Sequence, residues 1–111
     1  MSHRCIIPWD ESRKRQHEKG FSMPFVNQDS CDAEQLALHI SVIKPEQRAH
    51  EPHAHAGEEV MFLLEGTAEA TIGDETHIIE APCALFCPEN VLHGLKNCGQ
   101  TAIKYMVIRS I

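Results

Sequence analysis

PHAHAGEEVMFLLEG, residues 52–66, places two histidines and a carboxylate directly before an apolar run. His53 and His55 are two positions apart, so on an extended strand both imidazoles leave the same face, about 7 Å apart along the chain. On a helix, residues two apart do not face each other, and the proline and glycine that bracket the pair are poor helix-interior residues. The spacing therefore predicts an extended segment whose two histidines converge on one metal ion.

Glu59 is expected to begin the return strand after a turn at Gly57. Its even spacing from the histidines keeps its carboxylate on their side of the sheet. On the same parity Met61 and Leu63 line the metal side, while the residues between them pack on the other face of the sheet. Residues 59–64 are thus predicted to be a strand that carries a third ligand.

A fourth candidate ligand lies in PENVLHGLKN, residues 88–97, where His93 follows a proline-led turn. With this stretch the chain resembles the cupin superfamily, and in particular small single-domain cupins. The first cupin motif is glycine, five residues, HxH, three or four residues, glutamate, six residues and glycine. This sequence supplies its residues at those intervals: His53, His55, Glu59 and Gly66.

The second cupin motif, glycine, five residues, PxG, two residues, histidine, three residues and asparagine, is met by Pro88, His93 and Asn97. Three glycines of the two motifs are replaced, by Gln47, Pro82 and Asn90. None of the three is a ligand position, and asparagine tolerates a left-handed backbone nearly as glycine does, so the turn at Asn90 remains feasible. The resemblance implies a complete set of metal ligands: His53, His55, Glu59 and His93.

Three imidazoles and one carboxylate suit one divalent transition metal ion per chain, Fe, Mn, Ni, Co or Zn, and leave one or two coordination positions open. Each ligating histidine is expected to donate its second N–H to a carbonyl or carboxylate, with Glu58 as one candidate partner. His50 is interpreted as a residue of the rim or of the outer hydrogen-bonded shell.

The expected fold is all-β, an antiparallel double-stranded β-helix, or jelly-roll barrel, of eight or nine strands. Residues 35–43 alternate cleanly, which predicts a half-buried strand with one apolar face, made by Leu36, Leu38, Ile40 and Val42. Gly73-Asp74 is expected to turn a hairpin between the strands 67–72 and 76–80. The barrel is assigned to residues 35–111.

Residues 1–34 form an N-terminal arm, because they show no sustained period of 2 or 3.6. Trp9 and Phe25 would be costly to leave in water, so the arm is expected to bury them by docking on the barrel or on a partner subunit. Small cupins commonly wrap such arms over the barrel or onto a partner subunit, and the resemblance therefore implies a homodimer.

Composition limits the function classes. The 111 residues have room for one domain, carry a net charge of −6 and hold no apolar run long enough to span a bilayer. With no secretory h-region, the protein is expected in the cytoplasm, with neither nucleic acid nor membrane as partner.

The five cysteines form no C-x-x-C pair, so reduced thiols are expected. Cys83 and Cys87 are four residues apart and are expected on one face of a strand. They are interpreted either as small buried hydrophobic residues or as thiols at the rim of the pocket.

The predicted pocket is mostly apolar, lined by Met61, Leu63 and Ile40, and no paired arginines lie near the motifs. A small, weakly charged substrate is expected. The resemblance implies a metal-dependent enzyme, either a dioxygenase or an isomerase or lyase, and both reaction types can pass through a metal-bound enolate; the catalytic residues are not identified. The alternative is a non-catalytic module in which the metal anchors a small ligand for binding or sensing.

Overall fold

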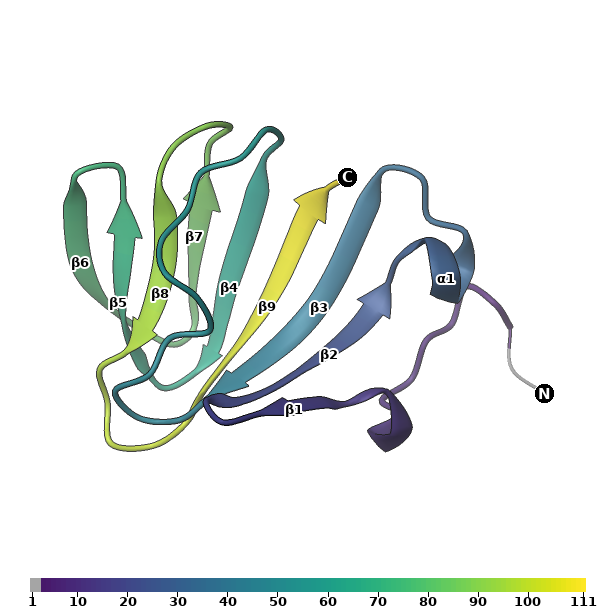
Figure 1. Cartoon of the computed structure of the whole chain (residues 1–111), viewed down its shortest axis with the longest axis horizontal. Helices are drawn as coiled ribbons and strands as arrows, with labels where there is room; N and C mark the ends of the chain where they lie inside the picture. The colour runs from purple at the N-terminus through teal and green to yellow at the C-terminus, as the bar shows by residue number, and fades with distance from the viewer. Residues whose placement is uncertain (1–2) are drawn as a thin grey trace.

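Two antiparallel β-sheets face each other in the computed structural model, which describes residues 3–111 (Figure 1). The larger sheet has the strand order β1-β2-β3-β9-β4-β7, and the smaller has the order β6-β5-β8. This arrangement confirms the predicted all-β, double-stranded β-helix. The elements are β1 (Arg15–His17), β2 (Gly20–Val26), β3 (Leu36–Ile43), β4 (Glu59–Glu65), β5 (Thr67–Ile72), β6 (Glu75–Glu80), β7 (Cys83–Cys87), β8 (His93–Asn97), β9 (Ile103–Ser110), the 3-10 turn η1 (Glu11–Arg13) and the helix α1 (Gln28–Cys31).

Strands β3, β4, β5 and β6 match those expected from the sequence pattern to within one residue at each end. The β5–β6 hairpin closes on the pair Ile72 and Glu75, with Gly73 at φ 61° in the turn, a backbone conformation that glycine adopts without strain. The sequence pattern therefore placed the hairpin correctly.

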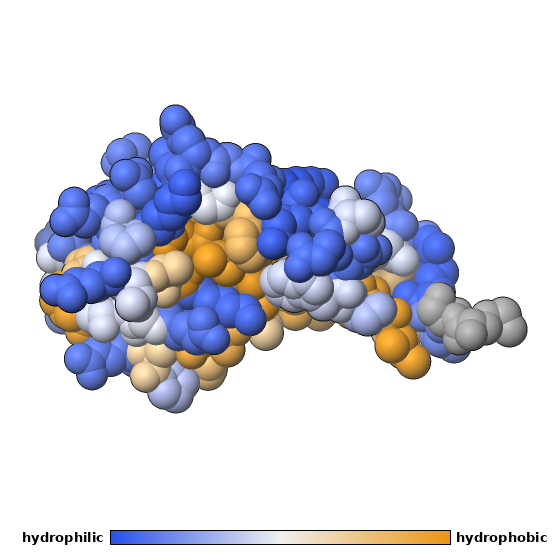
Figure 2. Space-filling model, turned by 90° about the horizontal axis from the view of Figure 1, so that it is seen from below, coloured by the Kyte–Doolittle hydropathy of each residue, from blue (hydrophilic) through white to orange (hydrophobic). Residues whose placement is uncertain are grey.

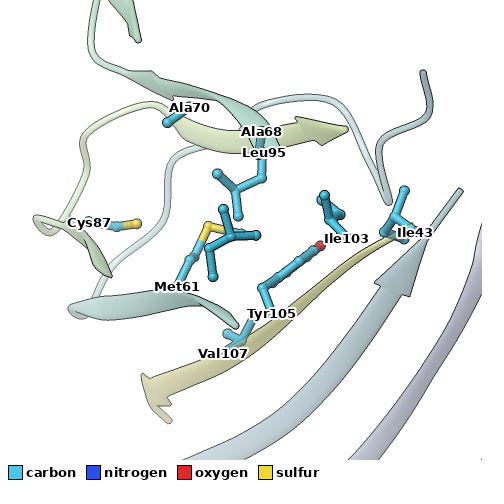
Figure 3. Close-up of a cluster of buried hydrophobic side chains, with 10 residues drawn as sticks. Ile43, Met61, Ala68, Ala70, Cys87, Leu95, Ile103, Tyr105 and Val107 are labelled. Carbon is cyan, nitrogen blue, oxygen red and sulfur yellow. The ribbon is translucent and has the colours of Figure 1, made fainter. Parts of the chain in front are cut away.

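The core fills the space between the two sheets (Figure 3). Met61, Tyr105 and Val107 from the larger sheet meet Ala68 and Leu95 from the smaller one. Leu63 is also part of this cluster and has no exposed surface. Small residues on β5 opposite large ones on β4 and β9 let the two layers interdigitate.

The face of β3 that points to the core is not the expected one. Alternation suggested the face that carries Leu36 and Ile40, but the residues that point inward are those of the other face. Ser41 and Ile43 are buried toward the barrel interior, whereas Leu36 on the alternate face is 55% exposed. Ile40 is buried too, but on the outer face, where the strand register pairs it with Met23 of β2. An apolar row on a strand indicates burial, and here the buried neighbour of Ile40 comes from a strand of the N-terminal arm instead of from the barrel core.

The N-terminal segment extends the larger sheet. β2 pairs with β3 along almost its whole length, from Gly20 opposite Ile43 to Val26 opposite Leu38, and β1 pairs in turn with β2. Figure 1 shows these two strands at one side of the molecule. Periodicity alone missed them because β1 has only three residues and because β2 contains Pro24, a residue that argues against a strand.

Trp9 docks on this extension without being buried. Its ring lies against the rings of Phe21 and Phe25, at centroid distances of 6.2 and 6.1 Å, and the ammonium group of Lys104 lies 5.5 Å from its centroid. Within the single chain Trp9 remains 42% exposed, while Phe25 is partly buried. Docking on the barrel therefore does not bury Trp9, and its burial on a partner subunit stays a prediction.

The lower end of the barrel is hollowed, and hydrophobic residues show in the hollow between hydrophilic ones (Figure 2). The strands that carry the candidate ligands, β4 and β8, both begin at the opposite end (Figure 1). Among residues 3–111, no helix is long and apolar enough to cross a bilayer.

Candidate metal centre

Three segments bring the four candidate ligands together. Glu59 is the first residue of β4 and His93 the first of β8. His53 and His55 lie in the connection between β3 and β4, where only His53 makes a β-bridge, to His93. The regular strand expected around the two histidines is therefore absent, and the bridge to His93 holds this part of the connection extended instead.

Two turns fix the loops that carry the site. Gly57, at φ 85°, reverses the chain before β4, as expected, and its N–H donates to the Glu89 carboxylate at 3.0 Å. Asn90 stands where the cupin motif has glycine and adopts φ 64°, the left-handed conformation that asparagine tolerates. Its N–H donates to the carbonyl of His55 at 2.8 Å. The loop before β8 is thereby tied to the loop that carries the first two histidines.

The donor atoms of His53, His55, Glu59 and His93 all lie within 4.8 Å of one another. The Glu59 carboxylate stands between two of the rings: His55 Nε2 is 3.1 Å from one oxygen, and His93 Nε2 is 3.5 Å from the other. Donor atoms about 2.0 to 2.2 Å from one ion are separated by distances of this order. The four side chains therefore form a group that could hold one metal ion.

Hydrogen bonds at the far side of two rings present Nε2 to the centre. Nδ1 of His55 lies 2.9 Å from the carbonyl oxygen of Ala56, and Nδ1 of His93 lies 3.0 Å from that of Val91. A carbonyl can only accept, so the proton is assigned to Nδ1 in each ring and the lone pair to Nε2. The partner expected in Glu58 is not used, since backbone carbonyls fill this role for both rings.

Two of the four candidate ligands are deeply buried. His93 is 1% exposed and Glu59 5%, and Nε2 of His93 is buried without a hydrogen-bond partner among the described residues. An unpaired buried nitrogen is costly unless a ligand satisfies it, and a metal ion would do so. Burial, followed by the proximity of His50, His93 and His55, lowers the pKa of His53. A lowered pKa favours the neutral imidazole that a metal requires.

A cavity of about 70 Å³ adjoins the candidate ligands. Of the residues expected to line it, Met61 does so, whereas Leu63 lies in the core and Ile40 on the outer face of the sheet. The remaining walls are more polar than expected. They come from β3, from the connection to β4 and from β9: His39, Ser41, Ala49, His50, His53, Glu59, Tyr105, Val107 and Arg109.

His50 is a rim residue, as anticipated. Its ring stacks on that of His53, with centroids 4.2 Å apart and planes 18° from parallel, while the side chain remains exposed. Sequence reasoning missed His39, Tyr105 and Arg109, because their parity on β3 and β9 becomes readable only once the sheet register is known. The register itself is informative: it pairs Arg109 with Glu59.

Cys87 is fully buried opposite Glu59, whereas Cys83 at the other end of β7 is partly exposed. Burial, with a further contribution from the charge of Glu59, raises the pKa of the Cys87 thiol to about 12. A thiol of that pKa stays protonated at neutral pH and is therefore a weak ligand and nucleophile. The small buried hydrophobe is the interpretation that fits Cys87.

Known proteins share the sequence pattern of this chain. A family model described as a cupin domain matches residues 39–109. Mannose-1-phosphate guanylyltransferase RfbM of Salmonella typhimurium is 28% identical over 102 residues, which make up 91% of this chain and 21% of that protein. The chain thus spans about a fifth of the length of this curated relative.

Solved structures share the architecture. An RmlC-like protein with a double-stranded β-helix fold from Methanocaldococcus jannaschii superposes with a TM-score of 0.74 at 13% identity, covering 95% of this chain and 88% of that one. A predicted oxalate decarboxylase from Thermotoga maritima superposes with a TM-score of 0.73 at 16% identity, covering 82% and 79%. At these identities the likeness concerns the fold.

Proposed function

The chain belongs to the cupin superfamily, and from this premise we propose that it is a metal-dependent enzyme that acts on a small organic molecule. The observation that carries the proposal is the buried, unpaired Nε2 of His93 beside Glu59, in a group of donors that adjoins a cavity. A purely structural histidine would have its ring nitrogens paired, since unpaired buried nitrogens are rare in native proteins.

His53, His55, Glu59 and His93 would hold the ion, which is Fe, Mn, Ni, Co or Zn. When bound, it would act as a Lewis acid that stabilises negative charge developing on a substrate oxygen. Four protein ligands leave room for a substrate at a five- or six-coordinate ion, in contrast to structural zinc sites, which are closed and mostly rich in cysteine. This openness favours catalysis over a purely structural role.

The residues of the chain itself supply positioning and exclusion of water. The Glu59 carboxylate lies 3.1 Å from Nε2 of His55 and 3.5 Å from Nε2 of His93, so it would share one ion with both rings and fix their relative orientation. The backbone carbonyls of Ala56 and Val91 hold the tautomers of these two rings. Tyr105 closes the cavity toward the core with 2% of its surface exposed, and burial raises its pKa, so that its hydroxyl remains protonated.

The small size of the cavity limits the substrate. Pockets for drug-sized ligands begin at about 300 Å³, several times the volume here. Among the solved relatives is the predicted oxalate decarboxylase, whose name denotes a very small substrate. We therefore propose a substrate of few non-hydrogen atoms, transformed by either a dioxygenase or an isomerase or lyase reaction.

The test compares the iron-loaded and zinc-loaded protein on a panel of enediols, catechols and small keto acids, following oxygen uptake and substrate loss. Oxygen consumption confined to the iron form would select the dioxygenase. Turnover with either metal and without oxygen would select the isomerase or lyase. Binding without turnover of any panel member would instead favour the metal-anchored binding or sensing module.

We further propose a cytoplasmic homodimer, in which the half-exposed Trp9 and its neighbours on the arm contact the partner subunit. The exposed indole, an apolar surface that a monomer would leave in water, supports this assignment. Sedimentation of the wild type and of Trp9→Ala would test it, with dissociation expected for the variant.

A further inference from the structure

We infer that Arg109 is the residue that recognises the substrate, through a carboxylate group held in the cavity beside the candidate metal centre. This inference rests on the proposed function and narrows its substrate class to small carboxylic acids. It replaces the weakly charged substrate expected from the sequence.

The position of Arg109 in the sheet aims it at the site. It lies on β9 directly across from Glu59 on β4, and directly opposite residues in an antiparallel pair point to the same face. Because Glu59 faces the histidines, Arg109 shares the interior face with Tyr105 and Val107, which lie at even spacing on the same strand. Arg109 accordingly lines the cavity together with Glu59.

The Arg109 side chain is half-buried, and its Nε has no protein partner among the described residues. Its Nε is buried and makes no hydrogen bond within residues 3–111, and no carboxylate oxygen of that range lies within 4.0 Å of its nitrogens. Glu59, the nearest acidic residue by register, directs its oxygens to His55 and His93 instead. An Nε–H donor that is buried without an acceptor is costly, and a carboxylate ligand would accept from it and from a terminal N–H of the same guanidinium group in two parallel hydrogen bonds.

Only two buried side-chain nitrogens in the described part of the chain lack partners, and both belong to this site: His93 Nε2 and Arg109 Nε. A metal ion would satisfy the first, and the second calls for an acceptor. The two needs are different in kind, because a metal takes a lone pair whereas a guanidinium N–H donates a hydrogen bond. With an ion on the histidines, one small acid in the cavity could bind both the ion and Arg109.

The local charge of the cavity also favours a carboxylate ligand. A divalent ion held by three neutral histidines and one carboxylate would leave one positive charge at the centre, and Arg109 adds another beside it. The cavity would therefore attract an anion even though the chain as a whole carries −6. The cavity of about 70 Å³ and the single guanidinium favour a planar carboxylate over a bulkier phosphate ester.

The experiment titrates pyruvate into zinc-loaded protein and follows binding by NMR, with pyruvamide as the uncharged ligand of similar size. For the wild type we expect pyruvate to bind and pyruvamide to bind much more weakly. In Arg109→Gln the affinity for pyruvate should fall roughly 10- to 100-fold, the range for a lost hydrogen-bonded charge pair, while the weak affinity for pyruvamide stays unchanged. Arg109→Lys, which keeps the charge but not the planar fork, should lie between.

Arg4→Gln is the matched control, because Arg4 pairs with Asp32 on the exposed N-terminal segment. It removes the same charge from the chain and should bind pyruvate as the wild type does. Equal affinity of Arg109→Gln and wild type, or equal binding of pyruvate and pyruvamide by the wild type, would overturn the assignment. Thermal melts of each variant verify folding.

Zinc content, measured on the same samples, separates this inference from the proposed function. Wild-type protein that takes up no zinc would contradict the metal centre, and pyruvate binding by the metal-free wild type would then still test Arg109. Zinc-loaded Arg109→Gln that keeps its metal and loses pyruvate affinity would support both.

Discussion

His53 and His93, forty positions apart in the chain, exchange two backbone hydrogen bonds: the N–H of His53 donates to the carbonyl of His93 at 3.0 Å, and that of His93 to the carbonyl of His53 at 2.8 Å. This bridge joins the two motifs directly. The approach of their side chains, with ring centroids 4.9 Å apart, therefore follows from the backbone and needs no ion to assemble it. The site is pre-organised by the fold.

His93→Ala should remove most of the bound metal. The substitution deletes the most deeply buried ligand, and metal affinity should fall by more than the roughly 10- to 100-fold that follows loss of an outer hydrogen-bond partner. Elemental analysis after dialysis against a metal buffer measures the effect. His77→Ala is the control, since His77 is exposed and lies beside Glu75 away from the site; equal metal loss in both variants would contradict the ligand role of His93.

Chelation should lower the melting temperature. An ion that binds only the folded chain stabilises it by about 2.7 kcal/mol when its free concentration is 100 times its Kd. For a chain of this size a loss of that order lowers the Tm by roughly ten degrees or more. Scanning calorimetry with and without chelator measures this shift, and His93→Ala should show none. An unchanged Tm in wild-type protein shown to contain metal would refute the linkage.

The metal-free protein should lose stability as the pH falls below neutrality. Burial lowers the pKa of His39 below its ordinary 6.5, so between the folded-state pKa and 6.5 the unfolded chain binds more protons than the folded one. Stability therefore falls as the pH decreases through this window, and the Tm at pH 5.5 should be lower than at pH 7.5.

His39→Gln should shrink this difference in Tm, whereas His77→Gln, at an exposed position, should leave it as in the wild type. A wild-type Tm that is higher at pH 5.5 than at pH 7.5 would contradict the sign of the effect. His53, whose pKa is also lowered mainly by burial, contributes in the same direction.

Asn97→Ala should destabilise the barrel by about 2 to 4 kcal/mol. Asn97 has no exposed surface; its amide donates to the carbonyls of Ile43 and Thr101 at 2.9 Å and its oxygen accepts from the N–H of Gly99. The alanine would leave these buried backbone groups unpaired. Denaturant unfolding measures the loss, and Gln100→Ala in the same turn is the control because Gln100 is exposed; equal unfolding free energies for the two variants would show that the Asn97 bonds contribute nothing.

The cupin motifs predicted the candidate ligands, and alternation and turn residues predicted strands β3 to β6, because each of these patterns can be read from short stretches of sequence. Glu59 and His93 stand at the starts of β4 and β8, where Gly57 and Asn90 provide the turns that the spacing required. The motif thus encodes the loop geometry as well as the donors. Asn90 shows this most clearly, since it keeps the left-handed turn without the glycine.

Features that depend on the pairing of strands far apart in the sequence could not be predicted. The alternation of β3 showed that one face is apolar but not which layer covers it, and the arm rather than the core packs against Ile40. Arg109 belongs to no motif and lies sixteen positions beyond His93. Only the pairing of β9 with β4 brings it beside Glu59, so that a pocket expected to be apolar acquires a cation.

The most direct test of the metal centre is X-ray absorption spectroscopy of the protein purified without added metal, paired with elemental analysis. We expect one transition metal ion per chain, coordinated by three imidazole nitrogens and one carboxylate oxygen at about 2.0 to 2.2 Å. Glu59→Gln should alter that shell, whereas Glu75→Gln should not. Protein that binds no transition metal, or a shell dominated by sulfur, would contradict the account.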